Sequence, residues 1–428
     1  MDVSRRAFVA SLAVLRQASA QNAYTLSRED ETLLEDVSRR AFLYFWEQAD
    51  AVTGLVLDRA LNGGQKTLGR SREVASMATT GFALTALCIG HARQWKKPAE
   101  IAERVRTTLR HLADVQAHER GWYYHFVDMH SGDRVWKCEL STIDTALLLA
   151  GVLTAQQCFE QDDEIARMAQ RIYDRVDFNW MLDRTTGYLR MGWRPESGFL
   201  RSAWTKYREN GILYVLGIGS TRHSIPVETW YRFTRDPVVF EDFRYVGGGP
   251  LFTHQYSQAW LDLRGLRDGA PYSLDYFQNS AVATRAHRAF CMSLRGLYPS
   301  YSENLWGITP SDSDIGYVGW GNGFSRRDID GTVVPCAAGG SLMFTPAISL
   351  AALRTMRERF GQYVYGRYGF ADAFHPISMW VDSDVVGIDL GITLLSAENL
   401  RTRRVWNWFS SQPNVRWAMN RIFRPGYS

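Results

Sequence analysis

Six apolar runs of helical length recur along the chain, and small, polar or acidic residues introduce each of them. The runs begin near Thr79, Thr142, Glu209, Asn279, Thr345 and Ile388. Successive starts lie 63, 67, 70, 66 and 43 residues apart, which is too long for a tetratricopeptide or ankyrin unit. The period suits a helical hairpin with a long loop, so the repeat predicts an all-α fold.

The segments between the runs are two-faced, whereas several of the runs are apolar nearly all round. Segments 99–116 and 162–176 carry apolar residues at steps of three and four, as amphipathic helices do. Buried helices that alternate with amphipathic ones predict an inner ring wrapped by an outer ring, an (α/α)6 barrel. An open α-solenoid and a helical bundle remain the alternatives.

The composition favours one large globular body. Hydrophobic residues are 46% of the 428 and charged residues 22%, enough for a substantial core and ordinary for a folded chain. No Pro/Ser-rich linker divides it, so we expect residues 21–428 to form a single (α/α)6 domain. No internal stretch is long and apolar enough to span a membrane. The net charge of +4 comes from scattered basic residues, and the sequence has no nucleic-acid-binding motif. Both observations argue against a nucleic-acid partner.

The N-terminus has the order of an export signal. Arg5 and Arg6 form a twin-arginine pair, an apolar stretch follows, and Ala18-Ser19-Ala20 matches a cleavage site before Gln21. Residues 1–20 therefore predict twin-arginine export and a periplasmic or secreted protein. The alternative is a simple N-terminal helix.

Metal and cofactor motifs are missing from the sequence. The five cysteines, Cys88, Cys138, Cys158, Cys291 and Cys336, are widely spaced without a C-x-x-C pair, which is typical of small buried side chains. The chain also lacks H-E-x-x-H and G-x-S-x-G. We therefore expect neither a metal nor a cofactor.

Loops between the predicted helices combine aromatic residues with glycine and polar groups. A pyranose ring offers an apolar face and a rim of hydroxyls, so flat aromatic rings beside polar side chains favour a carbohydrate site. The aromatic candidates for substrate contact are Trp122, Trp193, Tyr207, Trp320 and Trp380. The polar candidates are Asp58, Arg59, His254 and Gln255, with Asp312, Asp314 and Asp382 as further acidic loop residues.

Four carboxylates stand at the entrances of predicted buried helices: Glu139, Asp144, Glu209 and Asp389. A carboxylate at a helix N-terminus is stabilised by free N–H groups, which is a purely structural explanation for any one of them. In a barrel of parallel inner helices, however, these N-termini open on the same end, so distant carboxylates converge. Glycoside hydrolysis needs such a pair, one protonated and one ionised. Glu139 and Glu209 are the better candidates for the acid, and Asp389 for the base.

Ordered motifs across residues 35–410 resemble the bacterial glucoamylase-like family, which includes glycoside hydrolase family 144 with its enzymes acting on β-1,2-glucan. The motifs are ASMATTGFALTAL (75–87), GWYYHFVDMHSGDRVWKCELSTIDTALLLAG (121–151), MGWRPESGF (191–199), WTKYRENGILYVLGIGS (204–220), YGFADAF (368–374) and GIDLGITLLSAENLRTRRVW (387–406).

The resemblance implies an (α/α)6 barrel, inverting hydrolysis of a glucan, and essential acids at Glu139, Asp144, Glu209 and Asp389. Two positions depart from the family pattern. Leu390 follows the GID aspartate where relatives often have Gln, and Arg208 adjoins Glu209, where its charge favours an ionised carboxylate. If Arg208 points inward, Glu139 becomes the preferred acid.

The favoured function is thus hydrolysis of a neutral glucan, with β-1,2 linkage implied by the resemblance. A β-glucan transglycosylase would share the same residues. A polysaccharide lyase would act on uronates and would recruit a base and a charge neutraliser from Tyr207, His254 and Arg285. A non-catalytic glycan-binding protein would keep the aromatic rings and tolerate the loss of the carboxylates.

Overall fold

The computed structural model describes residues 24–65 and 73–426, so the predicted export signal lies outside the described residues. Its helices are α2 (Arg28–Glu47), α3 (Met77–Ala92), α4 (Pro98–Arg110), α5 (Thr142–Cys158), α6 (Asp163–Asp174), α7 (Phe178–Met181), α8 (Gly211–Gly219), α9 (Phe252–Trp260), α10 (Tyr276–Ser293), α11 (Pro335–Gly339), α12 (Pro346–Val364), α13 (Gly387–Thr402), α14 (Arg404–Ser411) and α15 (Pro413–Ile422). A π-helical turn, η2 (His111–Val115), continues α4, and η3 (Val227–Tyr231) is a 3₁₀ helix.

Short strands connect these helices. They are β1 (Arg59–Leu61), β2 (Val74–Ser76), β3 (His118–Glu119), β4 (Trp122–Tyr123), β5 (Phe126–Asp128), β6 (Leu140–Ser141), β7 (Gly192–Arg194), β8 (Gly198–Phe199), β9 (Pro237–Phe240), β10 (Phe243–Val246), β11 (Leu266–Asp268), β12 (Tyr365–Gly366), β13 (Gly369–Phe370), β14 (Asp384–Val386) and β15 (Phe423–Pro425). The fold is therefore mostly helical, which confirms the helical part of the prediction, whereas the short strands are not predicted by the sequence. No helix of the described residues is both long and apolar enough to cross a membrane.

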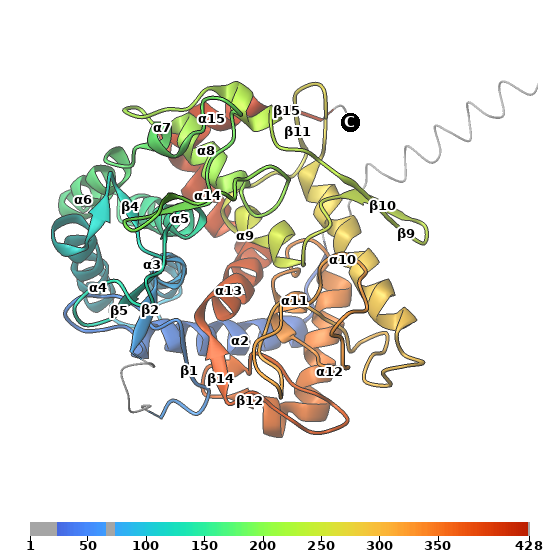
Figure 1. The fold of residues 1–428 in the computed structure, drawn as a ribbon. Coiled ribbons are helices and arrows are strands. Elements are labelled where there is room, and N and C mark those ends of the chain that lie inside the picture. Colours follow the sequence, from blue (N-terminus) through green and yellow to red (C-terminus); the bar gives the residue numbers. More distant parts are fainter. Residues whose placement is uncertain (1–23, 66–72, 427–428) are drawn as a thin grey trace, which may run out of the picture.

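Six helices are buried on nearly all sides: α3, α5, α8, α9, α11 and α13. Each packs against another of the set, with α3 between α5 and α13, α8 between α5 and α9, and α13 against α9 and α11. In Figure 1 these helices lie towards the middle of the molecule, while α4, α6, α10 and α12 lie towards its outside. The side chains of the six helices form much of the apolar core.

The outer helix α4 follows its predicted pattern. Ile101, Val105 and Leu109 are buried along one face, and Leu112 continues that face in η2. Val115 is the exception, because the π-helical turn rotates it out to solvent. The spacing of apolar residues thus predicts the buried face correctly until the helical geometry changes.

Helices α3 and α5 approach each other closely because glycine lies at their contact. A Cβ built on Gly151 would stand only 2.0 Å from the carbonyl oxygen of Gly81, and a Cβ on Gly81 would stand 2.3 Å from the carbonyl oxygen of Leu147. No larger residue fits there without moving the backbone. This contact fixes the spacing between the helices that carry the first two predicted entrances.

Two of the six apolar runs do not form helices that are buried all round. The run near Asn279 lies in α10 and the run near Thr345 in α12, and both helices bury one face and expose the other. The fully buried positions belong instead to α9 and α11. Hydropathy missed α9 because its buried residues include Gln255 and Gln258, whose amides hydrogen bond to neighbouring helices.

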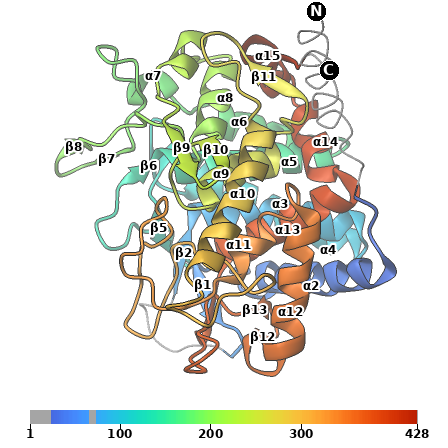
Figure 2. The same cartoon turned by 90° about the vertical axis from the view of Figure 1, so that its right-hand side faces the viewer.

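Strand pairs position the entrances of three buried helices. β2 pairs with β5 and leads into α3, β6 pairs with β7 and leads into α5, and β14 pairs with β1 and leads into α13. Viewed from the side, β1, β2, β5, β6, β7 and β8 gather on one side of the molecule (Figure 2). The backbone just before each of these helices is therefore held by hydrogen bonds to a second strand.

Candidate active site

Asp144 lies in the first turn of α5, at the N-terminus of the helix. Ser141 is the N-cap, and its hydroxyl accepts a hydrogen bond from the Asp144 backbone N–H at 3.3 Å while it donates to the Asp144 carboxylate. This capping satisfies free groups at the helix end and holds the aspartate side chain in place.

His125 lies between two of the predicted acids. Its Nδ1 is 3.2 Å from Glu139 Oε1, and its Nε2 is 3.5 Å from Asp144 Oδ1. The imidazole stacks on Phe126 with 3.8 Å between ring centroids, and the His125 backbone N–H donates to the Glu139 carbonyl at 2.9 Å. Burial favours the neutral ring, but the charges of Asp144 and Glu139 outweigh it and raise the pKa of His125. The ring therefore bridges both carboxylates, and their charges favour its protonated form.

Glu139 is held in its ionised form. The hydrogen bond from His125 is the main cause that lowers the pKa of Glu139 to about 2, against the effect of burial. Arg194 of β7 adds a second positive contact, with its Nη2 3.2 Å from Glu139 Oε2. A carboxyl that stays ionised near neutrality does not supply a proton.

Glu209 has the opposite environment. It precedes α8, where Ser257 accepts a hydrogen bond from the Ile212 N–H at 2.9 Å and donates one to the Glu209 carbonyl at 2.5 Å. Burial raises the pKa of Glu209 to about 7, although the charge of Arg208 opposes the shift. The Arg208 guanidinium reaches Asn322 Oδ1 at 3.5 Å. The concern that Arg208 would keep Glu209 ionised therefore does not hold, and Glu209 is the candidate acid by environment.

Asp389 occupies the first turn of α13 and interacts with Asp372, which follows β13. Burial and the neighbouring Asp389 charge raise the pKa of Asp372 well above its ordinary value, which favours a protonated Asp372 as the donor to Asp389. Burial also raises the pKa of Asp389, while hydrogen bonds from Asp372 and Cys336 oppose that rise. The pair shares one proton because two buried carboxylates in contact do not both ionise.

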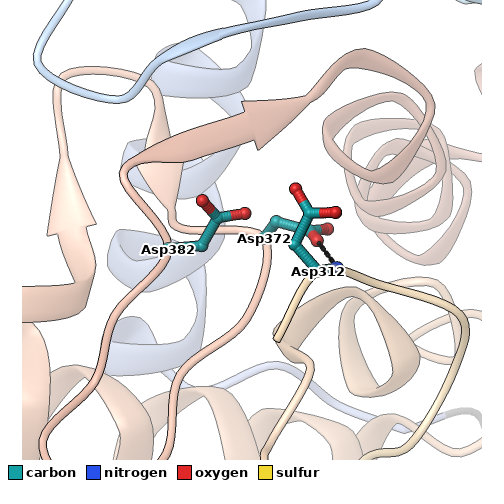
Figure 3. Close-up of side chains that lie close together, drawn as sticks. All are labelled: Asp312, Asp372 and Asp382. Atoms are coloured by element: carbon teal, nitrogen blue, oxygen red, sulfur yellow. Dashed lines mark hydrogen bonds between the residues drawn. The ribbon is translucent and has the colours of Figure 1, made fainter. Parts of the chain in front are cut away.

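Asp372 also belongs to a cluster with Asp312 and Asp382, in which one ligand oxygen from each lies within 4.8 Å of the others. Figure 3 shows the three carboxyl groups close together, with the Asp312 N–H donating to Asp372 Oδ2 at 3.0 Å. Burial raises the pKa of Asp382 to about 6. Oxygen donors of this kind suit a hard cation or sugar hydroxyls. Arg59 already brings a positive charge, with its Nη1 2.5 Å from Asp312 Oδ2.

The predicted contacts Asp58 and Arg59 join the carboxylates into one electrostatic network. Arg59 Nε lies 3.6 Å from Asp58 Oδ2, and the same guanidinium binds Asp312. Burial raises the pKa of Asp58, opposed by Arg59 and His125. The starts of α5 and α13 and the strand β1 therefore meet at one end of the buried helices. Asp314 is exposed and lies outside the Asp312–Asp372–Asp382 cluster, whereas sugar contacts for Asp58 and Arg59 stay a prediction.

Three of the aromatic candidates are core residues instead of sugar contacts. Trp122 is 0% exposed, packs edge-on against Phe178, and donates its indole N–H to the Asp177 carbonyl. Tyr207 packs between His254 and Tyr276 and is 6% exposed. Trp320 is buried too, with its indole N–H on Ser311 Oγ. These predictions are wrong because large rings next to glycine also serve to fill space under loops.

His254 and Gln255 are structural as well. His254 is buried with Nε2 2.9 Å from the Gly247 carbonyl oxygen, and burial lowers its pKa to about 4. Gln255 donates to the Ala337 carbonyl at 3.0 Å and to Ser341 Oγ at 2.8 Å, which ties α9 to the segment around α11. Both side chains are buried and hydrogen bond within the fold, although His254 Nδ1 has no partner among the described residues, so their burial argues against the predicted sugar contact.

Trp193 and Trp380 are partly buried. In β7, Arg194 reaches Glu139 and a Cβ on Gly192 would lie 2.9 Å from Glu139 Cγ, so alternation places Trp193 on the other face of the strand. There it packs on Trp180 with 5.5 Å between centroids. Trp193 therefore faces away from Glu139. Trp380 is partly buried, and its contact with sugar stays a prediction.

The residues that a lyase would need are not assembled. Tyr207 and His254 are neighbours but buried, and Arg285 lines a separate hollow with Arg264 and Asn399. No exposed base stands beside a neutralising arginine among these three residues.

Sequence reasoning missed the bridging role of His125 and the whole of Asp372. His125 lies within the motif at 121–151 without standing out there, and Asp372 lies inside the YGFADAF motif without a helix entrance beside it. The recurrence of His between two acidic motifs was the available signal for the first. No spacing rule points to the second, because strand pairing and loop closure bring it to Asp389.

Comparison with known proteins supports the resemblance of the sequence motifs. Residues 201–413 match the Glycoamylase family model, described as "putative glucoamylase". A curated relative from Parabacteroides distasonis, an exo β-1,2-glucooligosaccharide sophorohydrolase that acts at the non-reducing end, is 27% identical over 94% of this chain. The chain spans about 59% of the length of that relative.

Solved structures give the same grouping. A Bacteroides fragilis protein, described as a putative glucoamylase, is 28% identical with a TM-score of 0.86, over 96% of this chain and 100% of that one. The endo-β-1,2-glucanase from Chitinophaga pinensis is 25% identical with a TM-score of 0.85, over 94% of this chain and 99% of that one. The resemblance of the sequence motifs to the glucoamylase-like family is thereby confirmed.

Proposed function

We propose that the chain is a glycoside hydrolase that cleaves neutral β-1,2-linked glucan with inversion at the anomeric carbon. The observation that carries the proposal is the contrast between two glutamates at one site. Glu209 is kept protonated up to about pH 7 by burial, whereas His125 and Arg194 keep Glu139 ionised. The β-1,2 linkage is supported by the activities of the Parabacteroides and Chitinophaga relatives.

Glu209 acts as the general acid in this mechanism. It gives its proton to the glycosidic oxygen as the bond to the anomeric carbon breaks, so the leaving sugar departs as a neutral alcohol. A pKa of about 7 leaves the carboxyl protonated yet able to release the proton. Glu139, the other candidate, is assigned to charge balance and substrate positioning.

Asp389 acts as the general base. It takes a proton from a water that attacks the anomeric carbon on the face opposite the leaving group, which inverts the configuration. The hydrogen bonds from Asp372 and Cys336 favour its ionised form against the effect of burial. Asp144, fixed by Ser141 and His125, is assigned to binding a sugar hydroxyl or the transition-state charge.

We also propose that the buried and outer helices together form an (α/α)6 barrel, with this site at the N-terminal end of its inner ring. The successive packing of α13, α3, α5, α8 and α9, and of α11 on α13, supports a closed inner ring. Export through the N-terminal twin-arginine motif to the periplasm or beyond is part of the same proposal, and it is supported by the order of Arg5-Arg6, the apolar stretch and Ala18-Ser19-Ala20 in the sequence.

The test is product formation by the purified protein on β-1,2-, β-1,3-, β-1,4- and α-1,4-glucans, with the anomeric configuration followed by NMR. We expect short β-1,2-gluco-oligosaccharides released with inversion. Glu209→Gln should lose this activity, whereas Glu228→Gln, a change of an exposed glutamate in η3, should not. Both variants carry the same chemical change, so only the buried position differs.

The alternatives give different products on the same panel. Longer oligosaccharides formed from short donors would indicate a transglycosylase, and an unsaturated product from uronate glycans would indicate a lyase. Binding without any released product would indicate a glycan-binding protein. Hydrolysis that persists in Glu209→Gln would overturn the acid assignment.

A further inference from the structure

A tight turn at Val135–Cys138 projects from the strand ladder that carries the acidic residues. Arg134 bridges to Val127 and Leu140 bridges to Tyr124, so the turn is a bulge between two paired stretches. The Cys138 N–H donates to the Val135 carbonyl at 3.1 Å, which closes the turn. Such bulges near active sites direct a particular side chain.

The two central residues of this turn have left-handed backbone conformations. Trp136 has a φ of 53° and Lys137 a φ of 49°. A turn with positive φ at both central positions favours Asn and Gly, because a larger side chain crowds its own carbonyl. Neither Trp nor Lys is suited to it, so the local conformation is unfavourable and the surroundings hold it in place.

Two side chains hold the turn. Arg134 donates from Nε to the Cys138 carbonyl at 2.5 Å and from Nη2 to the Lys137 carbonyl at 2.7 Å, and its guanidinium pairs with Glu196 at 2.6 Å. The Cys138 sulfur lies 3.3 Å from the Phe126 backbone nitrogen and 3.2 Å from the Phe126 carbonyl oxygen. These contacts replace the backbone hydrogen bonds that a regular strand pair would make there. The conformation of the bulge is therefore stabilised by specific side-chain contacts.

The turn presents the Trp136 ring to solvent beside the acidic residues. Trp136 is 64% exposed and touches Phe126 edge-on, with 5.2 Å between ring centroids. Phe126 in turn stacks on His125, which bridges Glu139 and Asp144. The indole thus stands two ring contacts away from the carboxylates proposed for the reaction.

Packing does not account for the position of Trp136. Trp122 and Trp260 are fully buried, so each indole gains stability from packing in the core. Trp417 is also exposed, but it lies in the regular helix α15 and Arg421 covers its ring at 3.5 Å. Trp136 has an unfavourable backbone conformation, lies in a turn that Arg134 holds by hydrogen bonds, and exposes a ring that no other side chain of the described residues covers. A ligand that stacks on the ring supplies the missing contact.

We infer that Trp136 is a carbohydrate platform on which the apolar face of a glucosyl unit stacks, at a subsite beyond the bond that is cleaved. The inference rests on the proposed function and deepens it, because it assigns a binding position for longer chains. The ring adds affinity for a distal sugar and takes no part in proton transfer. Trp136→Ala should therefore weaken binding without slowing the chemical step.

The experiment measures kcat and KM of Trp136→Ala on β-1,2-glucan and on the shortest β-1,2-oligosaccharide that the protein hydrolyses. We expect KM on the polymer to rise roughly tenfold, equivalent to about 1.4 kcal/mol of lost stacking, with kcat unchanged. KM on the shortest substrate should stay the same. Trp136→Phe should recover part of the affinity because it keeps a flat ring.

Matched variants separate the platform from the fold. Trp417→Ala removes another exposed indole and should leave KM unchanged on both substrates. Lys137→Gly keeps the turn and Trp136, so it should leave KM unchanged and raise the melting temperature. An unchanged polymer KM in Trp136→Ala would overturn the inference, as would a loss of kcat that Trp136→Phe does not restore.

Binding separates this inference from the proposed function. Calorimetric titration of Glu209→Gln with β-1,2-oligosaccharides should show tighter binding than the same titration of Glu209→Gln/Trp136→Ala. If the wild-type protein released no product but this difference in binding remained, the proposed hydrolysis would fail while the platform stood. If hydrolysis occurred and the two variants bound equally, the platform alone would fail.

Discussion

The Nδ1 atom of His125 lies 3.2 Å from the Glu139 carboxylate, and this contact determines how protons are distributed over the site. Because Asp144 approaches the other ring nitrogen at 3.5 Å, one cation serves two carboxylates. Both the position and the charge of Glu139 depend on it. The acid role is thereby left to Glu209, which has no histidine bridge of this kind. Burial raises the pKa of Glu209 instead.

Replacing His125 with Gln should shift the pH dependence of activity. Gln carries no charge and reaches one carboxylate at most, so Glu139 becomes protonated at a higher pH. Because Glu139 positions the substrate while Asp389 is the base, we expect a lower maximum of kcat/KM and a further loss below about pH 5, where the Glu139 carboxyl then takes up a proton. His130→Gln is the control, since His130 is exposed and pairs with Asp50. An unshifted acidic limb would remove His125 from its positioning role.

The stability of the protein should depend on Glu209 in a pH-dependent way. Burial raises its pKa from 4.5 to about 7, so between these values the folded state binds more protons than the unfolded state. Stability then falls as the pH rises through this range. Glu209→Gln stays neutral, and we expect it to exceed the wild type by on the order of 1–3 kcal/mol at pH 8.

Urea unfolding at pH 8 and at pH 4 checks this expectation. Near pH 4 the glutamate is protonated in both states, so the two proteins should be equally stable. A stability difference of the same size at both pH values would point to packing as its cause. The variant should be inactive at both.

The sequence predicts the helical class because burial leaves a periodic trace in α4 and α6 and a continuous one in α3, α5, α8 and α13. It does not predict α9, because Gln255 and Gln258 look like surface residues until their partners on other helices are known. Burial of polar groups depends on hydrogen bonds between distant segments, which a local pattern does not encode.

The site shows the same division. Glu139, Asp144 and Asp389 stand next to helix starts that the sequence marks clearly, and the structure places them at one end of the buried helices. Asp372 comes from a loop, and only the pairing of strands and the return of the chain place it against Asp389. Exposure was the hardest property to infer, since Trp122 and Trp136 lie 14 residues apart in one motif with opposite environments.

Trp122→Ala should act on stability and not on catalysis. The buried ring packs on Phe178 and bonds to the Asp177 carbonyl, so its loss leaves a cavity. We expect the free energy of unfolding to fall by about 3–5 kcal/mol. At a temperature where the variant is folded, kcat/KM on β-1,2-glucan should match the wild type. A selective rise in KM would instead restore Trp122 as a substrate contact.

Gly151→Ala tests the contact between α3 and α5. The added Cβ would lie 2.0 Å from the Gly81 carbonyl oxygen, so the helices must separate. We expect a loss of several kcal/mol of stability, above the roughly 1–3 kcal/mol typical of overpacking, because backbone atoms are involved. Gly296→Ala is the control, since nothing lies within 4 Å of its Cβ. Equal melting temperatures for the two variants would contradict the close approach.

Two variants of Asp372 should differ although both remove its titration. Asn is neutral and has an N–H to donate, so Asp372→Asn reproduces the protonated side chain that hydrogen bonds to Asp389 and accepts from the Asp312 N–H. We expect it to keep most of the activity and its acidic limb. Asp372→Ala leaves Asp389 without this donor, which raises the pKa of the base.

The pH–rate profile of Asp372→Ala should therefore lose activity on the acidic side first, with the limb moved up by about one unit. The measurement is kcat/KM on β-1,2-glucan from pH 4 to pH 9 for the wild type and both variants. Similar profiles for Asn and Ala would show that the donated hydrogen bond does not tune Asp389. Such a result would move the base role from Asp389 to Asp144, whose carboxylate is fixed independently by Ser141 and His125.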